Sequence, residues 1–151
     1  MPNQAGDFAF TWANIGVTPT RGLILFVDGG IFDAVLPGTH NFKNERTDPL
    51  FPPGAGMMGA HSVAQSGIIP RPGRVAVTLS TAREMTAGQK FLYLWGSATY
   101  ADVFPGTPRR ITRFAWQIVV SNFSDNPAEV SFGNVYLKNG NCTDDECTEQ
   151  Q

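Results

Sequence analysis

This sequence of 151 residues has little charge, no basic excess and no long uninterrupted apolar run. Its 11 Lys and Arg and 13 Asp and Glu make up 16% of the chain, below the roughly 25% typical of soluble domains. Without a basic excess we expect no nucleic-acid partner, because such binding depends on neutralising phosphates. The stretch over residues 50–70 carries no charged residue. Prolines and glycines interrupt it, however, which excludes a membrane-spanning helix there.

Cysteine and histidine are also scarce, with two of each. His40 and His61 lack the short spacings that bring metal ligands together, so we expect no metal site and no cofactor. Cys142 and Cys147 leave three interpretations open: a small disulfide loop in an oxidising compartment, a metal site short of ligands, or a tail without function. No nucleophile elbow or other convergent catalytic set is visible, so we expect no enzyme activity.

Aromatic residues, glycine and proline are abundant. Aromatics make up 11% of the chain, beside 16 Gly and 11 Pro, a composition that argues against disorder and against a helical bundle. In several stretches apolar residues alternate with polar ones, which is the pattern of half-buried strands. The predicted strands are residues 8–13, 23–27, 32–36, 74–80, 90–104, 109–120 and 130–137.

Turn and cap signals separate these strands. Asp28-Gly29-Gly30 predicts a tight turn that ends the second strand, and Pro105-Gly106-Thr107-Pro108 predicts a type II turn between the two longest strands. Gly96, inside the first of these, indicates a bulge or a close backbone approach. Thr81-Ala82-Arg83-Glu84 fits a capping box ahead of a single helical turn that stops at Gly88.

These elements predict an all-β protein, namely an antiparallel immunoglobulin-like β-sandwich of about six to eight strands with one short helical turn. A small β-barrel is the alternative. We expect one domain over residues 1–141. Its Pro- and Gly-rich loop over residues 41–73 is either a surface connection or a segment that contacts a ligand or partner. Residues 142–151 hold four acidic residues and no basic one, and we expect them to form an acidic, flexible tail.

The best polar cluster lies on the hairpin expected from the two longest strands. If the strands pair across the turn at residues 105–108, Asp102 faces the arginines of the return strand, Arg110 and Arg113. One interpretation is a cross-strand ion pair that fixes the register and contributes up to about 1 kcal/mol. The other is a binding site for an anion or carboxylate, built from Arg110 and Arg113.

Three short motifs stand out: the turn Asn14-Ile15-Gly16-Val17-Thr18-Pro19, the pattern W-G-x-x-x-Y-x-D-x-F over residues 95–104, and Thr112-Arg113-Phe114. Together they resemble a widespread group of uncharacterised bacterial proteins. Members usually carry N-terminal hydrophobic helices followed by a β-sandwich, so the resemblance implies that fold. This chain begins its strand pattern at Phe8 without such a helix, so we expect a shortened start. The group has no established activity to carry over.

Three functions follow as hypotheses. The first is a non-enzymatic interaction or structural module that binds a protein partner or a second copy of itself. The second is a module for a small ligand or carbohydrate, using the 41–73 loop and the hairpin tips. The third is a subunit of a viral or secreted assembly, because exposed strand edges favour pairing. The resemblance favours an extracytoplasmic location, with membrane attachment only through an N-terminal anchor that is absent from this sequence.

Overall fold

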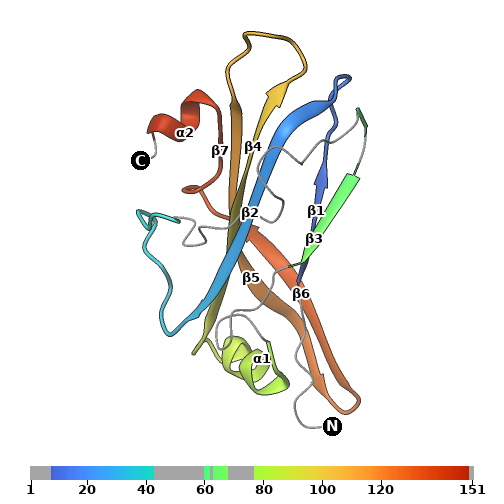
Figure 1. Cartoon of the computed structure of the whole chain (residues 1–151). Helices are drawn as coiled ribbons and strands as arrows, with labels where there is room; N and C mark the ends of the chain where they lie inside the picture. Colours follow the sequence, from blue (N-terminus) through green and yellow to red (C-terminus); the bar gives the residue numbers. More distant parts are fainter. Residues whose placement is uncertain (1–7, 43–59, 62, 68–76, 150–151) are drawn as a thin grey trace.

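The computed structural model describes residues 8–42, 60–61, 63–67 and 77–149 (Figure 1). This part of the chain is mostly antiparallel β-sheet with two short helices, which confirms the predicted all-β class. A five-stranded sheet has the order β2-β4-β5-β6, with β7 beside β5, and a separate two-stranded sheet pairs β1 with β3.

The elements have the following bounds. The larger sheet contains β2 (Thr20–Phe32), β4 (Phe91–Asp102), β5 (Arg110–Asp125), β6 (Ala128–Tyr136) and β7 (Cys142–Thr143). The smaller sheet contains β1 (Ala9–Ala13) and β3 (Val63–Gly67). The helices are α1 (Leu79–Thr86) and α2 (Asp145–Glu149). Every strand pair is antiparallel, and β5 pairs with β4 along one side and with β6 and β7 along the other.

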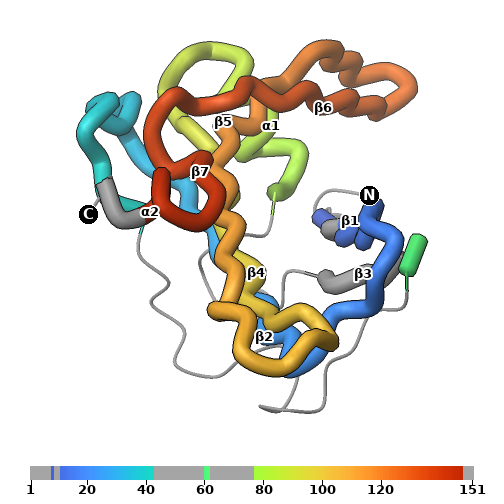
Figure 2. The backbone as a smooth tube through the Cα atoms, turned by 90° about the horizontal axis from the view of Figure 1, so that it is seen from above, coloured from blue at the N-terminus to red at the C-terminus, as the bar shows by residue number. Residues whose placement is uncertain are grey.

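The larger sheet curves around β1 and β3, while α2, which follows β7, lies on its other side (Figure 2). We call the face toward β1 the inner face. Its buried apolar residues are Leu23, Leu25, Val27, Leu92, Leu94, Ala98, Phe114 and Ile118. Trp12 of β1 packs on this face, with its ring centroid 5.4 Å from that of Phe114 in an edge-to-face contact. Ala82 and Met85 of α1 join the same core, so β1 and α1 together cover it.

The opposite, outer face has an aromatic core of its own. Tyr93, Trp95 and Ala115 are buried there, against partly buried Phe32, Leu36, Phe42, Phe91 and Leu137. The Tyr93 hydroxyl accepts a hydrogen bond from the backbone N–H of Leu36 at 3.1 Å, which holds the segment after β2 against the sheet. Both faces of β4 are therefore covered, and the rings of Tyr93 and Trp95 fill a core.

The predicted hairpin of the two longest strands is present as β4 and β5. Their register places Leu94 opposite Trp116 and Gly96 opposite Phe114. Gly106 in the connecting turn has a φ of 80°, in the left-handed region that glycine adopts without a steric penalty. β5 continues past the predicted end at residue 120 to Asp125 and pairs with β6 over this extension, with a register shift between Val120 and Asn122.

The turn predicted at Asp28-Gly29-Gly30 is wrong, because β2 continues through these residues to Phe32. Gly30 leaves room for packing instead, because a Cβ at this position would lie 2.9 Å from the ring of Phe32. The short strand predicted over residues 32–36 is likewise not formed beyond Phe32. Lys90 donates a hydrogen bond to Asp33 just after β2, and this bond and the attraction of the carboxylate raise the pKa of Lys90.

The helix cap is also misplaced in the sequence prediction. Thr78, not Thr81, is the N-cap of α1, and its Oγ1 accepts a hydrogen bond from the backbone N–H of Thr81 at 3.1 Å. The helix therefore starts at Leu79, inside the strand predicted over residues 74–80, of which residues 74–76 lie outside the described residues. The predicted stop is correct, since Gly88 follows the helix with a φ of 71°.

We expect Thr78→Ala to lower the free energy of unfolding by about 1 kcal/mol, because it removes the acceptor that caps the first turn of α1. Glu84→Ala is the matched control, since Glu84 stands at the position that a capping box beginning at Thr81 would need. Urea denaturation followed by tryptophan fluorescence measures both variants. If Glu84→Ala is the more destabilising change, the assignment of Thr78 as the cap is wrong.

Two boundary predictions also need correction. The segment expected as a long irregular loop contains β3, which pairs with β1 and so contributes to the small sheet; residues 43–59, 62 and 68–73 of it lie outside the described residues. The segment expected as a flexible acidic tail instead forms β7 and α2 over residues 142–149. Residues 150–151 lie outside the described residues. The described fold therefore extends beyond residue 141.

Candidate functional site

The predicted polar cluster forms at the end of the β4–β5 hairpin. The register places Tyr100 opposite Arg110, and the Nε of Arg110 lies 3.9 Å from Oδ2 of Asp102. This distance is long for an ion pair, and both side chains are partly exposed. The pair therefore contributes less than about 1 kcal/mol to stability, which agrees with a role in fixing strand register.

Arg110 has a second and closer partner that the sequence did not indicate. Its Nη1 donates a hydrogen bond to Oδ2 of Asp144 at 3.0 Å. The other oxygen of Asp144 accepts a hydrogen bond from the backbone N–H of Ile111 at 3.0 Å. One guanidinium is thus shared between two carboxylates, so the cluster carries one more negative than positive charge. The acidic run after Cys142 is the only sequence signal that could have pointed to Asp144.

Arg113 lies away from this cluster. It pairs in register with Ser97 of β4 and with Cys142 of β7. Because successive residues of a strand point to opposite faces, Arg110 and Arg113, three positions apart, project from opposite faces of β5. The structure therefore does not bring these two arginines to a common ligand, and we do not retain the anion site that the sequence suggested.

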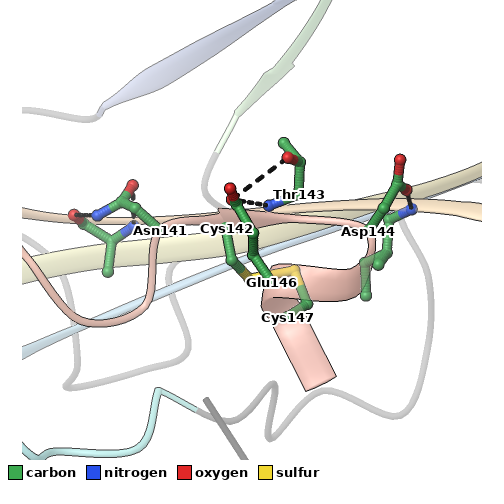
Figure 3. The surroundings of a disulfide bond; sticks show 8 residues. Asn141, Cys142, Thr143, Asp144, Glu146 and Cys147 are labelled. Atoms are coloured by element: carbon green, nitrogen blue, oxygen red, sulfur yellow. Dashed lines mark hydrogen bonds between the residues drawn. A yellow bond between two sulfur atoms is a disulfide. The ribbon is translucent and has the colours of Figure 1, made fainter. Parts of the chain in front are cut away.

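Of the three interpretations left open for the cysteine pair, the structure contains the disulfide. A bond joins Cys142 to Cys147, and both residues are buried (Figure 3). Asn141 anchors the segment just before the bond. Its Nδ2 donates to the carbonyl of Ala115 at 2.9 Å, and its Oδ1 accepts from the N–H of the same residue at 3.2 Å. The side chain of Asn141 thus imitates a strand partner for β5 and holds the disulfide segment on the sheet.

The two histidines lie apart from the cluster. The ring of His40 packs on Phe42, with centroids 4.7 Å apart, and His61 is exposed with a φ of 55°. Within the described ranges, no three His, Cys, Asp or Glu side chains come together in a way that could hold a metal ion. No helix in the same ranges is both long enough and apolar enough to span a bilayer.

The outer edge of β6 is a second surface of interest. No strand in the described part of the chain pairs with this edge, which we call the β6 edge. β6 contains neither Lys nor Pro, and Glu129 is its one charged residue. Three of its large apolar side chains are exposed: Phe132, Val135 and Tyr136. The strand therefore lacks the charges and prolines with which proteins usually protect a free edge.

The opposite edge of the larger sheet, formed by β2, is protected. The β2–β4 register shifts between Arg21 and Ile24, which marks an irregularity in the edge strand. Gly22 there has a φ of 58°, and Nη2 of Arg109 donates a hydrogen bond to its carbonyl at 2.7 Å. A distorted and partly capped edge is a poor template for another strand, so the two edges of this sheet differ in their readiness to pair.

Comparison of the chain with profiles of known protein families, with curated proteins and with solved structures finds no match.

Proposed function

We propose that this protein is a non-enzymatic structural and interaction module whose β6 edge pairs with the β6 edge of a second copy. The observation that carries this proposal is the contrast between the two edges of the larger sheet. The β2 edge is distorted and partly capped by Arg109. The register shift of the β5–β6 pair places its extra residue on β5, so β6 itself is continuous, and the β6 edge is weakly charged and flanked by exposed Val135 and Tyr136. Exposed edges of this kind are templates for strand addition.

The sequence of β6 is compatible with pairing to itself. In an antiparallel pair centred on Phe132, Glu129 of each copy faces Val135 of the other, so no like charges are opposed. The two Glu129 side chains lie six residues apart along the paired strands, which is about 20 Å. That separation exceeds the Debye length of about 8 Å at physiological salt. A second copy always presents the same edge, and two-fold pairs are the commonest form of self-association.

The arrangement of the two sheets is the second part of the proposal. We propose that the two sheets are the layers of a small β-sandwich, in which β1 and β3 cover part of the inner face. The contact of Trp12 with Phe114 supports this, as does the 5.2 Å separation of the ring centroids of Phe8 and Phe132. The immunoglobulin-like type stays a prediction. Sandwich subunits that pair by their edges also suit a larger secreted or viral assembly.

Val135→Lys is expected to convert a dimer into a monomer, because it places a charge on the exposed flank of the β6 edge. Size exclusion with light scattering should give about twice 16.4 kDa for the unaltered chain and about 16.4 kDa for the variant. Val35→Lys is the matched control, since Val35 is also exposed but lies in the segment after β2; it should stay dimeric. A monomeric unaltered chain, or equal association of both variants, contradicts the proposal.

We propose an extracytoplasmic location, with no nucleic-acid partner. The Cys142–Cys147 disulfide supports this location, because such bonds persist in oxidising compartments and are rare in the cytosol. Acid quenching of the native cells, followed by alkylation under denaturing conditions and mass spectrometry, should find both cysteines protected. Free thiols in freshly trapped protein argue for a reducing compartment.

A further inference from the structure

A cavity of about 510 Å³ lies between the β1–β2 turn and the inner face of the larger sheet. Residues of β1 and β2 line it, together with three further segments that are far apart in the sequence: the turn at residues 14–18, the end of β4, and Thr112 of β5. These are the three motif segments that stand out in the sequence. None of the lining residues belongs to β6, so the cavity is separate from the β6 edge.

The cavity has an apolar floor and aromatic walls. The buried side chains of Leu23, Leu25 and Ala98 make the floor, and Trp12 and Tyr100 pack against them at the sides. A cavity of this size with a mainly apolar surface is typical of sites for small organic molecules.

The turn that walls the cavity is held in shape by its own asparagine. Nδ2 of Asn14 donates a hydrogen bond to the carbonyl of Thr18 at 2.9 Å, and Oδ1 of Asn14 accepts one from the N–H of Gly16 at 3.0 Å. Asn14 therefore bridges the turn both as a donor and as an acceptor. The wall is therefore preorganised, which lowers the entropic cost of binding.

Asp102 is the only charged side chain among the described residues that line the cavity. Arg110 pairs with it at 3.9 Å and is bound more closely by Asp144, at 3.0 Å. Arg110 is shared between two carboxylates, and the nearby Arg109 donates to the carbonyl of Gly22. The carboxylate of Asp102 is therefore only weakly paired and favours a positively charged ligand. Aromatic faces attract cations through their ring quadrupoles, and Trp12 and Tyr100 therefore add to the same preference.

We propose that this cavity binds a small organic cation, in which an ammonium or quaternary ammonium group is carried on an apolar body. The apolar body contacts Leu23, Leu25 and Ala98, while the positive charge lies between the carboxylate of Asp102 and the aromatic walls. An anion is disfavoured there, because the carboxylate of Asp102 repels it and Arg110 is already bound by Asp102 and Asp144.

Three probes of nearly equal shape test the sign of the charge. Benzyltrimethylammonium is the cation, neopentylbenzene its neutral isostere and phenylmethanesulfonate the anion. By isothermal titration we expect the cation to bind with a Kd on the order of 0.1–1 mM, the neutral probe about tenfold more weakly, and the anion not measurably. Equal binding of all three probes, binding of the anion alone, or no binding of the cation overturns the inference.

Variants then locate the charge. Asp102→Asn should weaken binding of the cation about tenfold, or about 1.4 kcal/mol, while Asp33→Asn, at an exposed ion pair elsewhere, should leave it unchanged. Arg110→Gln should tighten binding about threefold, because it removes the competing cation. An anion site would show the opposite change for Arg110→Gln, so this variant decides the matter even if Asp102→Asn fails to fold. Dimerisation through the β6 edge is measured separately and does not enter this result.

Discussion

Gly96→Ala is expected to lower the free energy of unfolding by about 3 kcal/mol or more. Gly96 is buried in the middle of β4, where a Cβ would lie 2.3 Å from the backbone carbonyl oxygen of Phe26 and 2.7 Å from the ring of Phe114. A carbonyl oxygen of a neighbouring strand cannot move aside without breaking the β2–β4 pairing. Overpacking of this kind in a core typically costs about 1–3 kcal/mol, and more where the backbone must shift.

Gly38→Ala is the matched control for this experiment. No atom lies within 4 Å of a Cβ built on Gly38, so we expect a change within about 0.5–1 kcal/mol, the range of surface substitutions and of entropy effects in the unfolded chain. Urea denaturation followed by circular dichroism compares the two variants with the unaltered chain. Equal stability of Gly96→Ala and Gly38→Ala would show that β2 and β4 do not approach as closely at Gly96 as described.

The double variant Cys142→Ala/Cys147→Ala is expected to lose about 2 kcal/mol of stability. The cysteines are separated by 5 positions, and closing so short a loop constrains the unfolded chain by about 2 kcal/mol at 25 °C. This loss of stability should be concentrated in β7 and α2, the segment that the disulfide connects. A helix of five residues such as α2 has no stability of its own in water, and β7 pairs with β5 at only Thr112 and Arg113.

Reduction provides the control for the double variant. Dithiothreitol should destabilise the unaltered chain by a similar amount and leave Cys142→Ala/Cys147→Ala unaffected, since that variant has no bond to break. Hydrogen exchange should show faster exchange over residues 142–149 in the variant, with little change in β4. Identical urea midpoints for the unaltered chain and the double variant would mean that the bond does not stabilise the fold.

Much of the sheet could be predicted from the sequence, because strand periodicity is local. Phe114, Trp116 and Ile118 recur at every second position of the strand predicted over residues 109–120, and Phe114 and Ile118 are buried in the structure. The hairpin turn was predicted from Pro105-Gly106 for the same reason, since its backbone geometry depends on the residues of the turn itself. For Gly96 the sequence indicated a bulge or a close backbone approach, and the structure shows the approach of β2.

The failures occurred where distant residues decide the local structure. Asp28-Gly29-Gly30 has the composition of a turn, but pairing with β4 and the space needed by the ring of Phe32 keep it extended. Thr81 resembles a cap as well as Thr78 does, and packing of α1 on β5 selects between them. Asp144 was missed as a partner of Arg110 because 34 residues separate them. Composition alone suggested a tail there, and no pattern within the segment indicates β7.

The burial of the disulfide determines how it meets reagents in solution. Cys147 is 2% exposed and Cys142 is 6% exposed, so a reductant or alkylating agent reaches the sulfur atoms only when the C-terminal segment detaches from β5. When detachment is slower than the chemical step, the rate of reduction at high reductant concentration reports the opening rate of this segment. The rate at which the Cys142–Cys147 bond is reduced therefore measures how fast the C-terminal segment opens, and this measurement needs no added label.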